Sequence, residues 1–285
     1  MTTVDNERAI LGAEATAALP TEERRLEAGP VQPGEDARNE LRAFLMADES
    51  RLGQVYRCLE EGLDAEAIAE KCGVGYPSFV WNYRRLIRAL VDGDLPSAPT
   101  IALTAARKFR SILKDASLSG ATRAYLGANL EELERRANDA DRREEEVQRA
   151  QVQTQQAEAR NEMGIYVYAL PHYLRYPFEP DSGRTLLKVG RSDSDVIVRF
   201  RNQTRTTALP EEPILLRIYR TPGAATAPTE NKFHRLLEAA DHSRSVVRSA
   251  GREWFLTSTR FLEEIASVLG LPVDIVNDNE VIDDS

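Results

Sequence analysis

The sequence contains little of what builds disulfide-rich, zinc-binding or membrane proteins. Only two of its 285 residues are cysteines, Cys58 and Cys72, which are too few for a disulfide framework or for a zinc site made of cysteines. No apolar run reaches membrane-spanning length, and the N-terminus lacks the basic and then apolar pattern of a signal peptide. We therefore expect a cytoplasmic protein without membrane contact.

An excess of positive charge is also missing. The chain has 37 Lys and Arg against 46 Asp and Glu, which gives a formal net charge of -9. This balance excludes a generally basic coat for nucleic acid but not a single basic groove. The length suffices for two modest domains, and a hydrophobic content of 42% supplies their cores.

The N-terminal half divides into a tail and a helical domain. Residues 1–35 are rich in Ala, Glu, Thr and Pro with weak periodicity, so we expect a disordered tail. Over residues 36–128, apolar residues recur at three- and four-residue intervals, which predicts helices. Within this domain, residues 61–86 have the pattern of a helix-turn-helix, with Gly73 in the turn and Pro77 in the first turn of the second helix.

The second helix of this motif would present side chains suited to bases and phosphates: Ser78, Asn82, Arg84, Arg85 and Arg88. The first helix is acidic, with Glu66 and Glu70, and this opposes contact with DNA. A helical bundle that binds other proteins is therefore the alternative to a DNA reader.

Residues 129–162 are nearly all good helix formers and predict one long charged helix, either a spacer or a partial coiled coil. A short heptad seam runs along its beginning: Leu126, Leu130, Leu133, Ala137 and Ala140. This seam predicts a homodimer through the helices of residues 100–140, or else packing within one chain against residues 101–113.

At Met163 the composition changes to strand-forming residues. Three strands are expected, GIYVYAL, TLLKVG and ILLRIYRT, with helices at residues 196–203, 229–240 and 257–269. We therefore expect residues 163–272 to form a small antiparallel sheet with flanking helices, followed by an acidic tail at residues 273–285. The fold class of the whole chain is then α+β.

Side chains suited to phosphodiester chemistry occur in order along this domain. Tyr166 and Tyr168 project to one face of the first strand because strand side chains alternate. Lys188 lies near the end of the second strand, and Arg191 follows Gly190, where a missing side chain lets a ligand approach the backbone.

Further candidates lie on the expected helices. Arg199 would face the sheet, with Arg201 as a nearby contact to DNA. Glu230 and His234 lie four residues apart and therefore share a helix face. The segment of residues 171–185 is longer than a tight hairpin, carries His172 and two tyrosines, and is a candidate substrate-contacting insertion.

The ordered motifs GIYVYAL, KVGRS, VIVRF, ENKFHRLL and GREWFLT resemble the GIY-YIG nuclease superfamily, most closely its phage-type branch, over residues 163–270. The resemblance implies an endonuclease that hydrolyses phosphodiester bonds of DNA with one Mg²⁺ or Mn²⁺. Tyr166 would orient the attacking water, Arg199 would stabilise the phosphate, and Glu230 would hold the cation. Lys188 and Arg191 would neutralise backbone phosphates.

The second motif carries Lys188 where the family pattern has Tyr. This departure favours a rival function, a DNA-binding or regulatory protein that keeps the fold without cutting. A third alternative is a helical interaction protein whose C-terminal domain is only structural.

Overall fold

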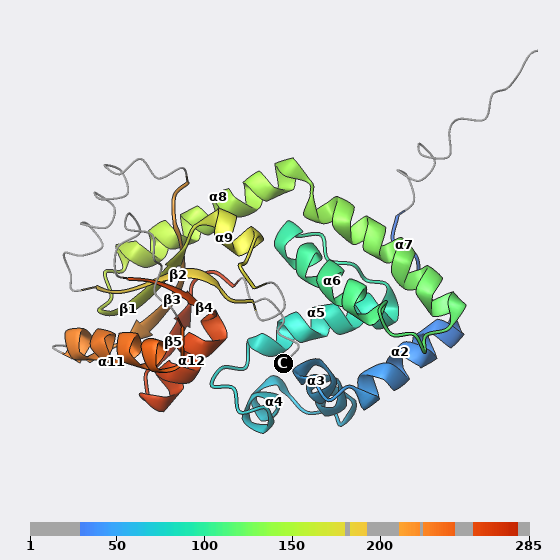
Figure 1. Ribbon diagram of the computed structural model, residues 1–285, viewed down its shortest axis with the longest axis horizontal. Helices are drawn as coiled ribbons and strands as arrows, with labels where there is room; N and C mark the ends of the chain where they lie inside the picture. The colour runs from blue at the N-terminus through green and yellow to red at the C-terminus, as the bar shows by residue number, and fades with distance from the viewer. Residues whose placement is uncertain (1–28, 180–182, 193–210, 223–224, 243–252, 279–285) are drawn as a thin grey trace, which may run out of the picture.

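The computed structural model describes residues 29–179, 183–192, 211–222, 225–242 and 253–278. Within these ranges the chain is mixed α+β, as the sequence predicts, with helices packed on one another beside a five-stranded antiparallel sheet (Figure 1). None of the helices in these ranges offers the long apolar stretch that crossing a bilayer requires.

The helical domain consists of α2 (Glu35–Ala47), α3 (Arg51–Glu60), α4 (Ala65–Lys71), α5 (Phe79–Asp92), α6 (Pro99–Ile112) and α7 (Gly120–Ala137). Helix α5 is its central element, because eight of its fourteen residues are buried. The Tyr125 hydroxyl of α7 donates to Leu90 O at 2.9 Å, which ties α7 to the end of α5.

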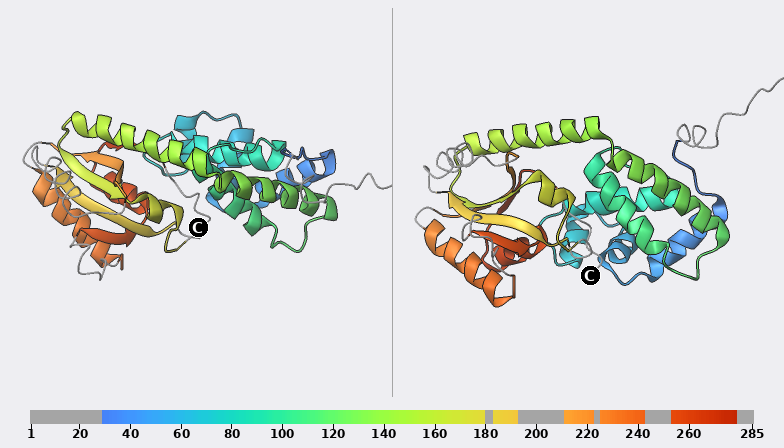
Figure 2. Two further views of the ribbon diagram at one scale, coloured as in Figure 1. Left: turned by 90° about the horizontal axis from the view of Figure 1, so that it is seen from above. Right: turned by 45° about the horizontal axis from the view of Figure 1, so that its top comes forward.

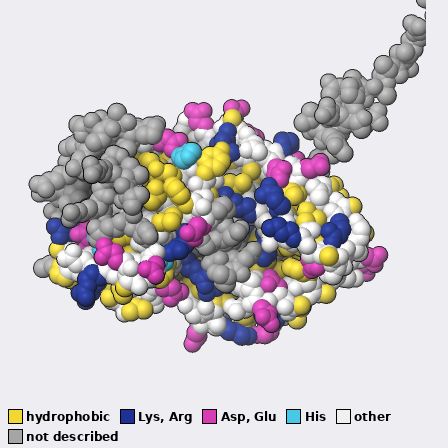
Figure 3. All heavy atoms as spheres, viewed as in Figure 1, with side chains coloured by type: hydrophobic (Ala, Val, Ile, Leu, Met, Phe, Trp, Pro, Cys, Tyr) yellow, Lys and Arg dark blue, Asp and Glu magenta, His cyan; other side chains and the backbone are white. Residues whose placement is uncertain are grey.

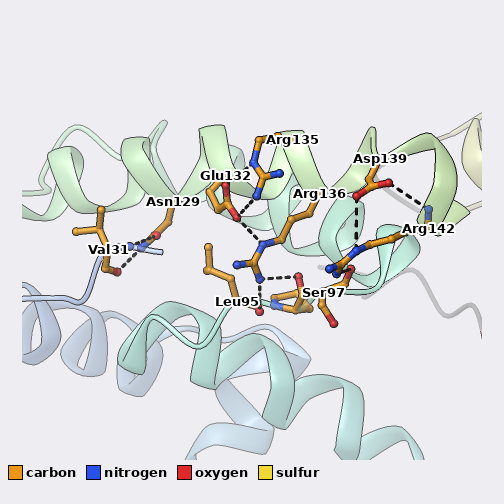
Figure 4. A network of polar contacts seen from close by, with 10 residues as sticks. Val31, Leu95, Ser97, Asn129, Glu132, Arg135, Arg136, Asp139 and Arg142 are labelled. Atoms are coloured by element: carbon orange, nitrogen blue, oxygen red, sulfur yellow. Dashed lines mark hydrogen bonds and ion pairs between the residues drawn. The ribbon is translucent and has the colours of Figure 1, made fainter. Parts of the chain in front are cut away.

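The expected disordered tail does not reach residue 35. Asn129 on α7 is fully buried, and its side-chain amide exchanges two hydrogen bonds of 2.9 Å with the backbone N–H and C=O of Val31 (Figure 4). Residues 29–34 are therefore part of the helical domain, because a buried amide needs both bonds.

The single long helix expected at residues 129–162 is wrong. Helix α7 ends at Ala137, and α8 (Ala140–Ala159) begins after a break at Asn138 and Asp139. The Asp139 carboxylate accepts from the Arg142 N–H at 3.1 Å and so caps α8. Asn and Asp favour helix caps over helix interiors, and this preference outweighs the helix-forming composition around them.

The heptad seam is used inside the chain. Leu126 and Leu133 are fully buried and share one core with Ala102 and Phe109 of α6. Of the two alternatives drawn from the seam, the structure shows packing within one chain. These residues are therefore not available for a homodimer.

The sheet has the order β4-β2-β1-β3-β5, and all neighbours are antiparallel. Its strands are β1 (Gly164–Ala169), β2 (Thr185–Ser192), β3 (Ile214–Arg220), β4 (Trp254–Thr257) and β5 (Val273–Ile275). Helices α9 (Pro171–Arg175), α11 (Thr226–Ala239) and α12 (Thr259–Val268) complete this domain within the described ranges.

Helices cover both faces of the sheet (Figure 2). Ile165 and Val167 of β1 share a core with Phe233 of α11 and with residues of α12. Tyr166 and Tyr168 face the other way and pack with Ala157 of α8. Helix α8 is therefore a packing layer of the sheet domain and not a spacer.

The two edge strands were not predicted from the sequence. Residues 273–275 pair with β3, and the Asp274 carboxylate forms ion pairs with Arg160 at 2.9 Å and Arg220 at 3.3 Å. Residues 273–278 thus belong to the sheet domain, which corrects the expected acidic tail. The helix expected at residues 196–203, with Arg199 and Arg201, lies outside the described residues.

Candidate functional site

Five titratable side chains converge where β4 stops pairing with β2. We term them the β2-edge cluster: Lys188, Arg191, Glu230, His234 and Glu253. The β2–β4 pairing ends at Lys188 and Trp254, and α11 lies against the following part of β2. The His234 ring donates from Nε2 to Val189 O at 2.9 Å, since a carbonyl can only accept.

Glu230 is the less exposed of the two carboxylates in this cluster. Its side chain is 14% exposed, and Oε2 lies 3.7 Å from Arg191 Nε. The Arg191 backbone N–H also donates to the carboxylate. Burial raises the pKa of Glu230, and the charge of Glu253 adds to this shift, while His234 and Arg191 oppose it. Glu230 and Glu253 are therefore close enough to repel each other.

Lys188 is less exposed than the other basic side chain of the strand, Arg191. Its Nζ lies 3.3 Å from Glu253 Oε2, and its side chain is 16% exposed. Burial lowers the pKa of Lys188, whereas the charges of Glu253 and Glu230 act in the opposite direction. Charged groups of both signs are thus held in a site that is partly shielded from water. Burying such groups costs folding stability, and this arrangement is typical of functional sites.

The carboxylates suit a divalent cation only in part. Among the described residues, no group of three or more His, Cys, Asp or Glu is arranged to hold a metal. Mg²⁺ commonly takes one or two protein carboxylates and completes its shell with water and substrate phosphate. Glu230 and Glu253 fit that requirement, and a cation between them would offset the burial that raises the pKa of Glu230 and the charge of Glu253 that adds to it.

Tyr166 and Tyr168 share one face of β1, as predicted, with stacked rings 6.3 Å apart. That face is covered by α8, and the two residues are only 2% and 5% exposed. The Tyr166 hydroxyl donates to Glu162 O at 2.6 Å, and the Tyr168 hydroxyl donates to Glu158 Oε1 at 3.0 Å. Both phenols are therefore engaged in the packed layer beneath α8.

The expected helix-turn-helix differs from the motif in its turn. Gly73 has φ +66°, as expected, but α5 begins at Phe79, so that Pro77 precedes the helix. The connection spans residues 72–78, whereas the DNA-binding motif uses a turn of about 3–4 residues. Ser78 is exposed at the start of α5, and its side chain forms no capping hydrogen bond.

Three of the other candidate DNA contacts on α5, Asn82, Arg84 and Arg88, have partners within the chain. Asn82 Nδ2 donates to Asp278 Oδ2 of the sheet domain at 2.7 Å. Arg84 lies over the ring of Trp81 at 5.1 Å, and Arg88 pairs with Asp94 at 2.5 Å. These contacts do not support α5 as a free reading helix.

A cleft of about 1350 Å³ lies between the two domains and could not be foreseen from the sequence. Arg85 and Arg88 of α5 line it opposite α9, and α8 contributes Arg143 and Arg149. Carboxylates lie among these arginines, and Figure 3 shows side chains of both signs along the boundary between the domains.

Sequence reasoning left Glu253 out of the site, although the motif GREWF contains it. The structure brings it in because it immediately precedes Trp254, which lies directly opposite Lys188 in the β2–β4 register. The chain matches no protein-family model, no curated protein and no solved structure.

Proposed function

We propose that the sheet domain is an endonuclease that binds a phosphodiester of DNA at the β2-edge cluster and hydrolyses it with one Mg²⁺ or Mn²⁺. The observation that carries this proposal is the meeting of Lys188 and Arg191 with Glu230 and Glu253 at one end of β2. Cations would neutralise the phosphate, and the carboxylates would hold the metal ion. The order of motifs along the chain supports the same reading.

Each side chain has a role that its surroundings suit. Lys188 and Arg191 would bind phosphate oxygens, since both carry charge in a site of limited exposure. A bound divalent cation supplies charge neutralisation and a more acidic water. His234 donates from Nε2 to Val189 O, so its neutral form has Nδ1 as the basic nitrogen and can accept a proton there.

A plasmid-nicking assay with Mg²⁺ or Mn²⁺ tests this proposal. Glu230→Gln should lose nicking because it removes a metal ligand while keeping the size of the side chain. Glu264→Gln is the matched control, since Glu264 is an exposed carboxylate on α12 of the same domain. Equal nicking by the two variants would remove Glu230 from the site.

A second function, DNA binding without cleavage, is favoured by the tyrosines. Tyr166 is buried and its hydroxyl is engaged, and Lys188 occupies the position of the second family Tyr. In that case the wild type would shift DNA in a gel without nicking it in either metal. Charge reversal at Arg191 would then weaken binding, because the phosphate contacts would be shared by both functions.

A further inference from the structure

Aromatic side chains gather on the segment between β1 and β2 and on the neighbouring strand β4. We term them the aromatic platform: His172, Tyr173, Tyr176, Phe178 and Trp254. Tyr176 is 56% exposed and Phe178 is 59% exposed, so that two large rings are open to solvent near one another. On the face in Figure 3, hydrophobic side chains flank a histidine in the region of α9.

The platform is continuous, because each ring contacts the next. The His172 and Tyr176 ring centroids are 5.1 Å apart, and Tyr173 lies 5.9 Å from both His172 and Phe178. Tyr173 also meets the Trp254 ring edge-on at 6.3 Å. The rings therefore form one surface and are not separate exposed residues.

A fixed cation borders this surface. The Arg175 guanidinium lies over the Tyr176 ring at 5.3 Å, and Arg175 Nε donates to the Tyr176 hydroxyl at 2.8 Å. Its other nitrogens donate to Asn138 Oδ1 at 2.9 Å and to Ala137 O at 3.3 Å. Arg175 is thereby held against the helical domain, and a ligand that stacks beside Tyr176 meets a positive charge already in position.

The other end of the platform reaches the β2-edge cluster. Trp254 lies directly opposite Lys188 in the β2–β4 register, and directly opposite residues project to the same face of a sheet. Glu253, the ion-pair partner of Lys188, precedes Trp254 in the chain. Trp254 thus connects the platform to Lys188, one of the candidate phosphate-binding groups.

We propose that the aromatic platform stacks unpaired nucleobases, so that the preferred substrate is a single strand, or a duplex with an unpaired segment. This inference rests on the proposed phosphodiester site and names its substrate class. Single-strand binding surfaces combine aromatic rings with positive charge, and every base offers a π-face to them. Paired bases inside a duplex do not offer these faces, so an intact duplex gains nothing from the platform.

Binding of labelled oligonucleotides in metal-free buffer tests the proposal by fluorescence anisotropy. The probes are oligothymidine, oligouridine, an abasic strand of equal length and a blunt duplex. The wild type should bind the base-bearing strands more tightly than the abasic strand, whose phosphates are the same. Loss of one stacked base costs about tenfold in affinity, so Tyr176→Ala/Phe178→Ala should weaken oligothymidine binding by about that factor or more.

A control outside the platform keeps the result specific. Met46→Ser removes a half-exposed apolar side chain from α2 and should change nothing. Both truncated rings are more than half exposed, so unchanged melting temperatures should verify the fold of the double variant.

The outcomes separate the two proposals. Equal affinity of the wild type for the abasic and base-bearing strands would overturn the platform while leaving a phosphate site intact. So would full oligothymidine affinity in the double variant. Absence of binding to all four probes, together with absence of nicking, would overturn the proposed function itself. Tighter binding of both oligothymidine and oligouridine than of the abasic strand supports stacking.

Discussion

The Arg217→Met substitution should be among the most destabilising in the sheet domain. Arg217 on β3 is fully buried, and its Nε donates to Glu263 Oε1 of α12 at 2.7 Å. Its Nη1 donates to Asn277 O at 2.8 Å. The Tyr76 hydroxyl of the helical domain also hydrogen-bonds Glu263, so the pair links the two domains. Removing the guanidinium leaves Glu263 buried without its charge partner.

Breaking a buried ion pair from one side costs about 3–5 kcal/mol, a large part of the roughly 5–15 kcal/mol that stabilises a typical domain. With a urea dependence of about 1–3 kcal/mol per molar, the unfolding midpoint should fall by at least about 1 M. The measurement is urea unfolding followed by circular dichroism. The double variant Arg217→Met/Glu263→Leu should recover most of the loss, since apolar replacement of a buried pair is often neutral.

The pH dependence gives a second check on the same reasoning. Burial raises the pKa of Glu263, and Arg217 opposes that shift. Without Arg217 the pKa rises further, so the variant loses stability as pH rises through it and regains stability toward about pH 4, where the carboxyl is neutral. A single variant that costs less than about 1 kcal/mol, or a double variant that costs the sum of the two singles, would refute the argument.

Three further predictions concern the site and the helical domain. Glu230→Gln should be at least as stable as the wild type at neutral pH. The pKa of Glu230 is raised in the folded protein, so the wild type loses stability when Glu230 ionises, whereas the variant does not. The difference in melting temperature should vanish near pH 4, and a clear loss of stability in the variant at pH 7 would contradict this prediction. Asn129→Ala should cost about 1–3 kcal/mol and make residues 29–34 sensitive to protease, since both Val31 hydrogen bonds are lost; unchanged proteolysis would count against their packing. Leu133→Ala should lower the free energy of unfolding by about 2–5 kcal/mol without altering the mass measured by light scattering, because Leu133 is buried within one chain. A dimer mass in the wild type that falls in the variant would restore the homodimer hypothesis.

The central strands and several of the helices could be predicted because their signals are local. The alternation in GIYVYAL gave β1, and the i, i+4 spacing of Glu230 and His234 gave one face of α11. The edge strands could not be predicted in the same way, since β4 and β5 have only four and three residues and owe their conformation to pairing with distant strands.

The site was predicted in its parts and not in its assembly. Lys188, Arg191 and Glu230 come together at the end of β2, but the pairing of Lys188 with Glu253 depends on β4. The burial of Tyr166 depends on α8, whose polar composition gave no sign that it packs on the sheet. Long-range packing decided both points, and no short segment of sequence records it.

The position of α8 also sets an order of events during synthesis. Helix α8 is translated before β1, yet it packs on β3 and receives a hydrogen bond at Ala150 O from Asn277. At about 5–20 residues per second, roughly ten seconds separate the appearance of α8 from that of Asn277 on the ribosome. The helical domain can fold during that interval, whereas the sheet domain cannot close. Nascent chains of this protein should therefore carry a folded first domain and a protease-sensitive second domain until residues 273–278 have emerged.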